Sequence, residues 1–175
     1  MPFSRLNFII SLVVFIAFSL NIYAHDNHFL SSKNLQKISS SSLKIFKIKI
    51  YDIDLWSNRN FFSYDNNIAI EIKYLKNISK IKIIESSISE INKQKKLSNK
   101  IKLKYNEYLN QSLVNIKKND IMTAIYIDNE ISFYHNNKLT NSINDKAFAI
   151  DFLNIWLGKN SSYPKITKQL ISHSE

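Results

Sequence analysis

The sequence predicts an α+β fold in which an antiparallel sheet is covered by helices. Two segments, Leu43–Trp56 and Ile68–Tyr74, alternate apolar and polar side chains, as half-buried strands do. Two later stretches repeat apolar residues at steps of three and four, which is typical of amphipathic helices. Further short strands and two C-terminal helices follow. Because strands and helices come in groups rather than in strict alternation, an α+β architecture is favoured over a parallel one.

The first 24 residues have the pattern of a secretory signal peptide. Arg5 precedes an apolar stretch, Leu6–Ile22, and Ile22-Tyr23-Ala24 offers a cleavage site. The alternative is an uncleaved N-terminal anchor, although the stretch is slightly short for a span. We therefore expect a signal peptide at 1–24, a polar leader at 25–42 and one domain at 43–175.

The chain contains no cysteine. This excludes a lipoprotein anchor, disulfides, a thiolate nucleophile and a cysteine zinc site. Export without disulfides favours a bacterial periplasm over a small disulfide-stapled secreted scaffold. We expect a periplasmic protein that meets the membrane only through its signal segment.

The net charge of +10 is carried almost entirely by lysine, since Arg5 and Arg59 are the only arginines. Specific nucleic-acid readers depend on arginine forks and on basic residues grouped on one face. Here the lysines are spread over all elements, so we predict no nucleic-acid partner. A solvated lysine surface is favoured over a surface for anionic lipid or another polyanion.

Leu43–Trp56 carries the strongest strand signal. Ile48 and Ile50 alternate with lysines, but Ile53 and Leu55 continue the apolar pattern in the opposite phase. A reversal of phase within one strand indicates a bulge, which we place near Tyr51. The leader before it is expected to hold at most a short strand around Leu35–Ile38.

Helices are predicted after the second strand and at the C-terminus. The first begins at Ser79, a plausible N-cap, and the second covers Ile101–Ile116. The last two are expected at Asp145–Leu157 and Pro164–Ile171. Gly158, the only glycine, follows the third helix, where a C′ residue with positive φ is common.

Hairpins are predicted between these helix pairs. Ile121–Ile127 and Ile131–Tyr134 form the first, and Leu139–Ile143 adds a third strand. Asparagine tolerates left-handed backbone geometry better than most residues, so it can replace glycine in the turns. The asparagines expected to do so are Asn119, Asn129, Asn136 and Asn137.

Three ordered blocks of this sequence resemble the bacterial exported branch of the chalcone isomerase superfamily. The first is Leu43–Trp56, with Tyr51-Asp52-Ile53-Asp54-Leu55-Trp56 similar to the family's Tyr-Asp-Ala-x-Leu-Trp. The second is Ser87–Ile91, similar to Ser-x-x-Glu-Met. The third runs from Asn119-Asp120 to Ile155-Trp156-Leu157-Gly158. The resemblance implies an open-faced β-sandwich with helices covering one side.

The resemblance also bears on function. The plant isomerases use an arginine and a threonine, but Tyr51 stands at the threonine position and Lys44 is the nearest cation. Lysine does not reproduce a guanidinium fork. Non-catalytic members of the superfamily bind fatty acids, so the first hypothesis is a non-catalytic module that binds a fatty acid or similar apolar ligand, with no cofactor. The alternatives are an isomerase or lyase acting by proton transfer around Tyr51 and Lys44, and a structural partner of an envelope protein.

Seven residues are candidates for the ligand pocket, and the carboxylates and tryptophans among them have a structural alternative. The carboxylates can face solvent, and the tryptophans can belong to the core. The candidates are Tyr51, Asp52, Asp54, Trp56, Tyr74, Glu90 and Trp156. After cleavage, His25 with Asp26 or His28 could chelate copper, but a polar terminus is the favoured interpretation and we predict no metal. No phosphate loop, nucleophile elbow or zinc-protease motif supports another enzyme class.

Overall fold

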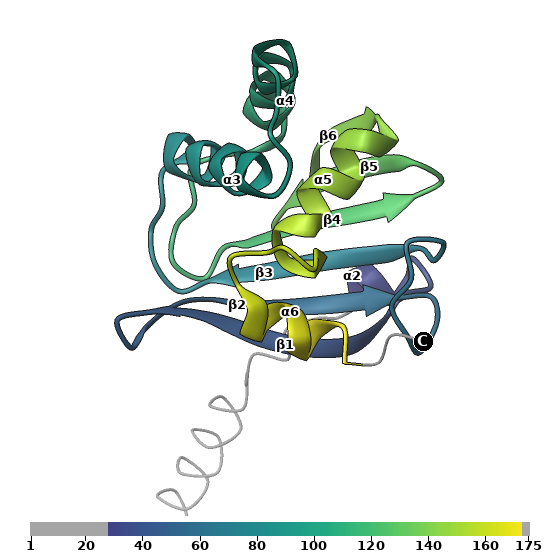
Figure 1. The fold of residues 1–175 in the computed structure, drawn as a ribbon. Coiled ribbons are helices and arrows are strands. Elements are labelled where there is room, and N and C mark those ends of the chain that lie inside the picture. The colour runs from purple at the N-terminus through teal and green to yellow at the C-terminus, as the bar shows by residue number, and fades with distance from the viewer. Residues whose placement is uncertain (1–27, 173–175) are drawn as a thin grey trace, which may run out of the picture.

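A computed structural model describes residues 28–172 of the chain. Its centre is one antiparallel sheet of six strands in the order β1-β2-β3-β4-β5-β6, which is also their order in the sequence (Figure 1). The strands are β1 Gln36–Ile45, β2 Ile48–Ser57, β3 Ile68–Tyr74, β4 Ile121–Ile127, β5 Glu130–His135 and β6 Lys138–Asn144. The helices are α2 His28–Ser31, α3 Lys80–Gln94, α4 Asn99–Ser112, α5 Lys146–Leu157 and α6 Pro164–Leu170.

The longer helices cover one face of the sheet, so the predicted α+β fold with a helix-covered antiparallel sheet is confirmed (Figure 1). α5 packs on β5, α6 packs on β1, and α3 packs against α5. The main core fills the space between, with Ile70, Leu109 and Leu153 fully buried. On the opposite face α2 covers a small second core of Leu30, Leu35, Trp56, Ala69 and Ile125.

The predicted strand Leu43–Trp56 is wrong in one respect, because it is two strands joined by a tight turn. Phe46 and Lys47 form this turn with φ of 47° and 68°. Hairpin turns of this kind are normally marked by asparagine or glycine, and neither is present here. β1 therefore begins at Gln36, inside the segment that we expected to be a polar leader, and its serines pair along β2.

The bulge expected near Tyr51 is present. Leu43 pairs with Tyr51 and Lys44 pairs with Lys49, which leaves Ile50 as the extra residue of β2. Beyond the bulge, Tyr51, Ile53 and Leu55 are buried against the helices. The bulge thus turns the apolar side chains of β2 toward the main core.

Local capping and turn predictions agree with the structure. Ser79 caps α3 by accepting a hydrogen bond from the Lys82 backbone N–H, and Asp145 caps α5 in the same way through Phe148. The four asparagines expected in left-handed geometry all have positive φ. Side-chain oxygens that cap the first turn satisfy donors that a helix leaves unpaired.

The positive φ expected at Gly158 is wrong, because its φ is −73°. A Cβ at this position would lie 2.7 Å from the Asn154 carbonyl oxygen and 2.7 Å from Gln94 Oε1. The requirement for glycine is therefore one of space: α3 and the end of α5 approach too closely for a side chain.

Candidate functional site

A cavity of about 600 Å³ lies between the helix-bearing face of the sheet and helices α3 and α5. Its wall is mainly apolar. From β3 the cavity is lined by Ile70, Ile72 and Tyr74, alternate residues that share the helix-bearing face of the sheet. The apolar lining includes Ile70, Ile72, Leu113, Met122, Ala124, Phe133, Phe152 and Ile155.

Tyr51 and Trp156 join the sheet to α5 in the cavity wall. The Trp156 Nε1–H donates a buried hydrogen bond of 2.8 Å to the Tyr51 hydroxyl oxygen. The Tyr51 ring also meets the Tyr74 ring edge to face, with 5.7 Å between the centroids. Among the described residues, no group accepts the Tyr51 O–H proton, which leaves this phenol able to donate within the cavity.

Both phenols of this group are neutral at ordinary pH. Burial raises the pKa of Tyr51 well above its usual value, although the hydrogen bond from Trp156 acts in the opposite direction. Burial alone raises the pKa of Tyr74. Desolvation disfavours the charged form of a phenol. These side chains can therefore donate hydrogen bonds but are poor general bases.

Glu90 contributes a buried carboxylate to the same cavity. Its Oε1 accepts a 2.7 Å hydrogen bond from the Ser162 backbone N–H and a longer one from Gln94. Burial acts to raise the pKa of Glu90, but hydrogen bonds from Ser162 and Gln94 and the positive charge of Lys93 together outweigh it and leave the pKa below its usual value. Glu90 is consequently a charged anchor for the loop between α5 and α6, placed near Tyr51 and Tyr163.

The cavity opens where β1, β3 and α3 come together. Lys76 and Lys82 line this mouth and are exposed, and Ile45 beside them is about half exposed. Within residues 28–172, neither lysine has a carboxylate partner. Sequence reasoning missed both residues, because no pattern distinguishes them from the other lysines.

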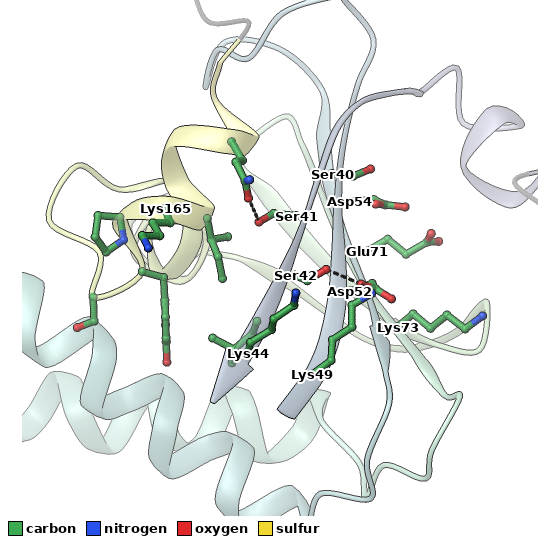
Figure 2. A pocket seen from close by; sticks show the side chains of 16 residues that line it. Ser40, Ser41, Ser42, Lys44, Lys49, Asp52, Asp54, Glu71, Lys73 and Lys165 are labelled. Atoms are coloured by element: carbon green, nitrogen blue, oxygen red, sulfur yellow. Dashed lines mark hydrogen bonds and ion pairs between the residues drawn. The ribbon is translucent and has the colours of Figure 1, made fainter. Parts of the chain in front are cut away.

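The structure brings together four of the seven predicted pocket residues: Tyr51, Tyr74, Glu90 and Trp156. Asp52 and Asp54 lie on the opposite face of β2, where Lys49 and Lys37 pair with them. Figure 2 shows these carboxylates in a row with Glu71 and Lys73, in a polar groove that runs around strand β1. Asp52 and Asp54 therefore line this groove and not the apolar cavity.

Trp56 and Lys44 are also placed away from the cavity. Trp56 belongs to the second core under α2, on the face opposite Tyr51. Lys44 is exposed and lines the polar groove around β1. The alternation of a strand separates Trp56 and Lys44 from the side chains that point toward the helices.

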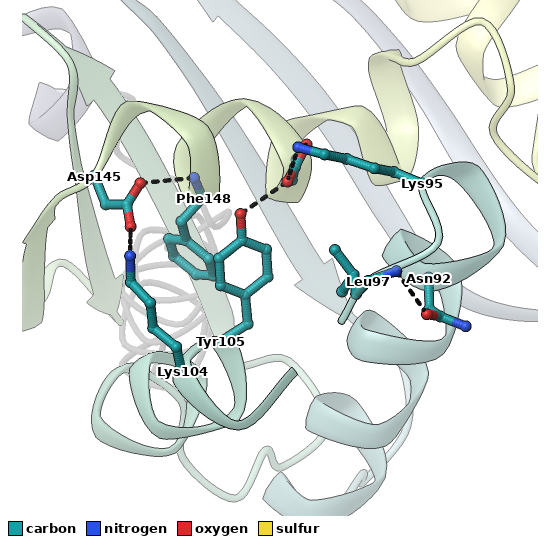
Figure 3. A network of polar contacts seen from close by, with 8 residues as sticks. Asn92, Lys95, Leu97, Lys104, Tyr105, Asp145 and Phe148 are labelled. Carbon is teal, nitrogen blue, oxygen red and sulfur yellow. Dashed lines mark hydrogen bonds and ion pairs between the residues drawn. The ribbon is translucent and has the colours of Figure 1, made fainter. Parts of the chain in front are cut away.

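A polar network holds the helices that enclose the cavity (Figure 3). Asp151 of α5 accepts a 2.8 Å hydrogen bond from the Tyr105 hydroxyl of α4 and a 2.9 Å bond from Lys95 at the end of α3. Asp145 pairs with Lys104 of α4 in the same way. Sequence reasoning missed this network, since nothing local relates Asp151 to residues some 50 positions earlier.

The described part of the chain was compared with two further kinds of site, a metal site and a membrane span. It contains no group of three or more histidine, aspartate or glutamate side chains able to hold a metal ion. His25 and Asp26, the proposed copper ligands, lie outside the described residues, as does the side chain of His28. None of the helices between residues 28 and 172 is both long and apolar enough to cross a bilayer.

Comparisons with known proteins place these features in a wider group. The family model described as chalcone isomerase-like matches residues 44–171. Among solved structures, a fatty-acid binding protein of Arabidopsis thaliana is similar with a TM-score of 0.56 and 9% sequence identity. The match covers 78% of this chain and 84% of the plant protein. At this identity the likeness concerns the fold. No curated protein matches the sequence.

Proposed function

Because this chain belongs to the chalcone isomerase-like family, we propose that it is a non-catalytic module that binds a fatty acid or a similar apolar ligand. The family resemblance noted in the sequence is confirmed by the match over residues 44–171. The observation that carries the proposal is the apolar cavity between the sheet and α3 and α5. The fold it shares with a plant fatty-acid binding protein supports the choice of ligand.

The size and lining of the cavity suit an acyl chain. Its volume of about 600 Å³ lies within the range of about 300–1,000 Å³ that small-molecule sites occupy. Phe133, Phe152 and Met122 form a wall that is buried from solvent. Each methylene moved from water to such a wall contributes about 0.8 kcal/mol, so a long chain gains more than a short one.

The charges around the cavity determine how a fatty acid would lie. A carboxylate near Tyr51 or Tyr163 would face the negative charge of Glu90. A buried charge without a partner is also costly. At the mouth, Lys76 and Lys82 offer positive charge in contact with solvent. We therefore propose that the carboxylate of the ligand lies at the mouth and that its chain lies inside the cavity.

The arrangement gives little support to proton-transfer catalysis around Tyr51 and Lys44. A general base must lie within reach of the reacting group and have a pKa near the working pH. Lys44 lines a different surface, and the raised pKa of Tyr51 keeps its phenol protonated. Tyr51 is better suited to hold Trp156 and to donate a hydrogen bond.

Export to a periplasm is part of the same proposal. Its support is the apolar stretch Leu6–Ile22 behind Arg5 and the absence of cysteine. The expected outcome is a protein recovered from the periplasmic fraction. Recovery from the cytoplasm with Met1 retained would contradict it.

The experiment that tests the binding proposal is native mass spectrometry of the purified protein, followed by extraction with organic solvent. We expect an added mass that corresponds to one acyl chain and an extract that contains the free acid. The protein stripped of ligand should then bind added oleate. A clean mass for the free protein, together with no binding of oleate, would refute the proposal.

A further inference from the structure

The turn between β1 and β2 presents apolar side chains to solvent. This hairpin tip, Lys44–Lys49, carries Phe46 at 95% exposure, with Ile45 and Ile48 each about half exposed. Exposed apolar groups that are contiguous mark surfaces for interaction. Within residues 28–172, no other large apolar side chain is as exposed as Phe46.

Phe46 also occupies a backbone geometry that its side chain does not favour. Its φ of 47° lies in the left-handed region, where a bulky residue is an outlier and asparagine or glycine is usual. Such strain costs about 1–3 kcal/mol and is concentrated at functional sites. The backbone geometry therefore does not explain a phenylalanine at this position. A contact between its ring and another surface would explain it.

Lysines surround the apolar tip. Lys44 and Lys47 belong to the tip itself, and Lys76 and Lys82 line the same cavity as Ile45. Lys49 pairs with Asp52, but no carboxylate of the described residues pairs with the other four lysines. An apolar tip within unpaired positive charge is complementary to an anionic phospholipid surface, which attracts each nearby lysine by about 1 kcal/mol.

The tip adjoins the cavity. Ile45 lines the cavity mouth, and the Leu75 backbone N–H donates a 2.9 Å hydrogen bond to the Ile50 carbonyl, which fixes the hairpin to the strand that leads into α3. A surface that receives Phe46 would therefore also lie against the mouth.

We propose that the hairpin tip inserts Phe46 and Ile48 into the interface of an anionic phospholipid bilayer, and that this contact sets the cavity mouth against the lipid. Docking to the bilayer does not require a ligand in the cavity, so the two proposals can be tested independently. It adds a membrane contact to the one that the N-terminal segment was expected to make.

The test uses tryptophan as a reporter of position in the full chain. Phe46→Trp and Ile48→Trp place a reporter at two positions of the tip. If one variant fails to fold, the other still tests the proposal. Leu103→Trp is the matched control, because Leu103 is also exposed and lies between two lysines but does not line the cavity. The two native tryptophans are buried and give a common background.

Vesicles of phosphatidylcholine and phosphatidylglycerol in equal parts should shift the emission of both tip reporters to shorter wavelength. The shift should be absent with phosphatidylcholine alone and should be lost at high salt. Adding Lys44→Glu to the Phe46→Trp protein reverses one charge and should raise the lipid concentration at half-maximal emission shift about 30-fold, while Lys102→Glu should change it little.

Three results would overturn the proposal. One is an unchanged emission of both tip reporters on anionic vesicles. Another is a shift at Leu103→Trp as large as at the tip, or an equal shift on phosphatidylcholine alone, because either would indicate general adsorption. The third is a shift that grows with protein concentration in the absence of lipid, since a second copy of the chain would then cover the tip.

Discussion

Trp156 donates its indole N–H to the hydroxyl of Tyr51 at 2.8 Å, and this buried bond joins α5 to β2 at the wall of the cavity. The two residues are 105 positions apart in the sequence. The bond satisfies a polar group that burial would otherwise leave unpaired, and it fixes the helix relative to the sheet at the point where the ligand is proposed to bind.

Tyr51→Phe removes the acceptor and leaves the Trp156 N–H buried without a partner. We expect the free energy of unfolding to fall by about 1–3 kcal/mol, measured by urea denaturation. Tyr74→Phe is the matched control and should cost less, since no hydrogen bond to another described side chain is lost. A double-mutant cycle with Trp156→Phe should give a coupling energy of about 1 kcal/mol, and zero coupling would contradict this role.

Ala124→Leu fills part of the cavity from β4. Ala124 is buried and lines the cavity, so the larger side chain takes space from about two methylenes of a bound chain. We expect the affinity for oleate to fall about tenfold, measured by titration of the stripped protein. Ala147→Leu, at an exposed position of α5, should leave the affinity unchanged. Equal affinity in both variants would place the ligand elsewhere.

Lys76→Ala together with Lys82→Ala removes the positive charge of the mouth. Exposed ion pairs contribute up to about 1 kcal/mol each, so the affinity for a fatty acid should fall about tenfold. The affinity for the fatty alcohol of the same length should not change. Lys80→Ala is the control, because Lys80 lies on the same helix but does not line the cavity. An equal loss for acid and alcohol would show that the carboxylate does not bind at the mouth.

Asp120 should make stability depend on pH in the acid range. Its partial burial acts to raise the pKa, but hydrogen bonds from Asn136, the Lys117 backbone and His135 outweigh it and hold the pKa of Asp120 at about 2. A depressed carboxyl pKa stabilises the fold above the unfolded value of about 4, and this contribution is lost as pH falls toward 2.

Asp120→Asn should therefore destabilise the protein at neutral pH, and its difference from the parent should shrink between about pH 4 and pH 2. The measurement is the free energy of unfolding in urea at several pH values. Asp65→Asn, at an exposed loop position without an ion pair among the described residues, is the control and should show no such trend. A constant difference across the range would contradict the assignment.

Gly158→Ala should destabilise the protein by about 1–3 kcal/mol, although its backbone angles suit any residue. The added Cβ would press on the Asn154 carbonyl and on Gln94. Gly158→Asn separates the two explanations for glycine. Asparagine would be tolerated at a left-handed position, but here it should be at least as harmful as alanine. Thermal unfolding of both variants provides the measurement.

Periodicity predicted the elements whose own residues carry the signal. The alternation of Ile68–Tyr74, the cap at Ser79 and the asparagine turns are local features, and the structure shows each of them. The fold class follows from their order. Strand β1 was predicted only at its two ends, around Leu35–Ile38 and from Leu43. Its serine-rich middle was missed because serine has little strand preference, and its place depends on pairing with β2 and on cover from α6.

The errors at the site have a physical origin as well. The turn at Phe46-Lys47 lacks the usual residues, so two strands looked like one. Trp56, Asp52 and Asp54 were grouped with Tyr51 by nearness in sequence, although a strand sends its neighbours to opposite faces. Glu90 and Ser162 are 72 positions apart in the sequence, and no local sequence pattern predicts that they form a hydrogen bond.

The first strand of the sheet is secured by nearly the last residues of the fold. The Ser39 hydroxyl donates to the Leu170 carbonyl at 2.6 Å, and Ser41 donates to Gln169. During synthesis, more than a hundred residues must therefore follow β1 before the helix that covers it is made. Contacts between distant parts of a chain slow folding. A fragment of the chain that stops before α6 would therefore keep the pairing of β1 with β2 but would lack the helical cover of β1.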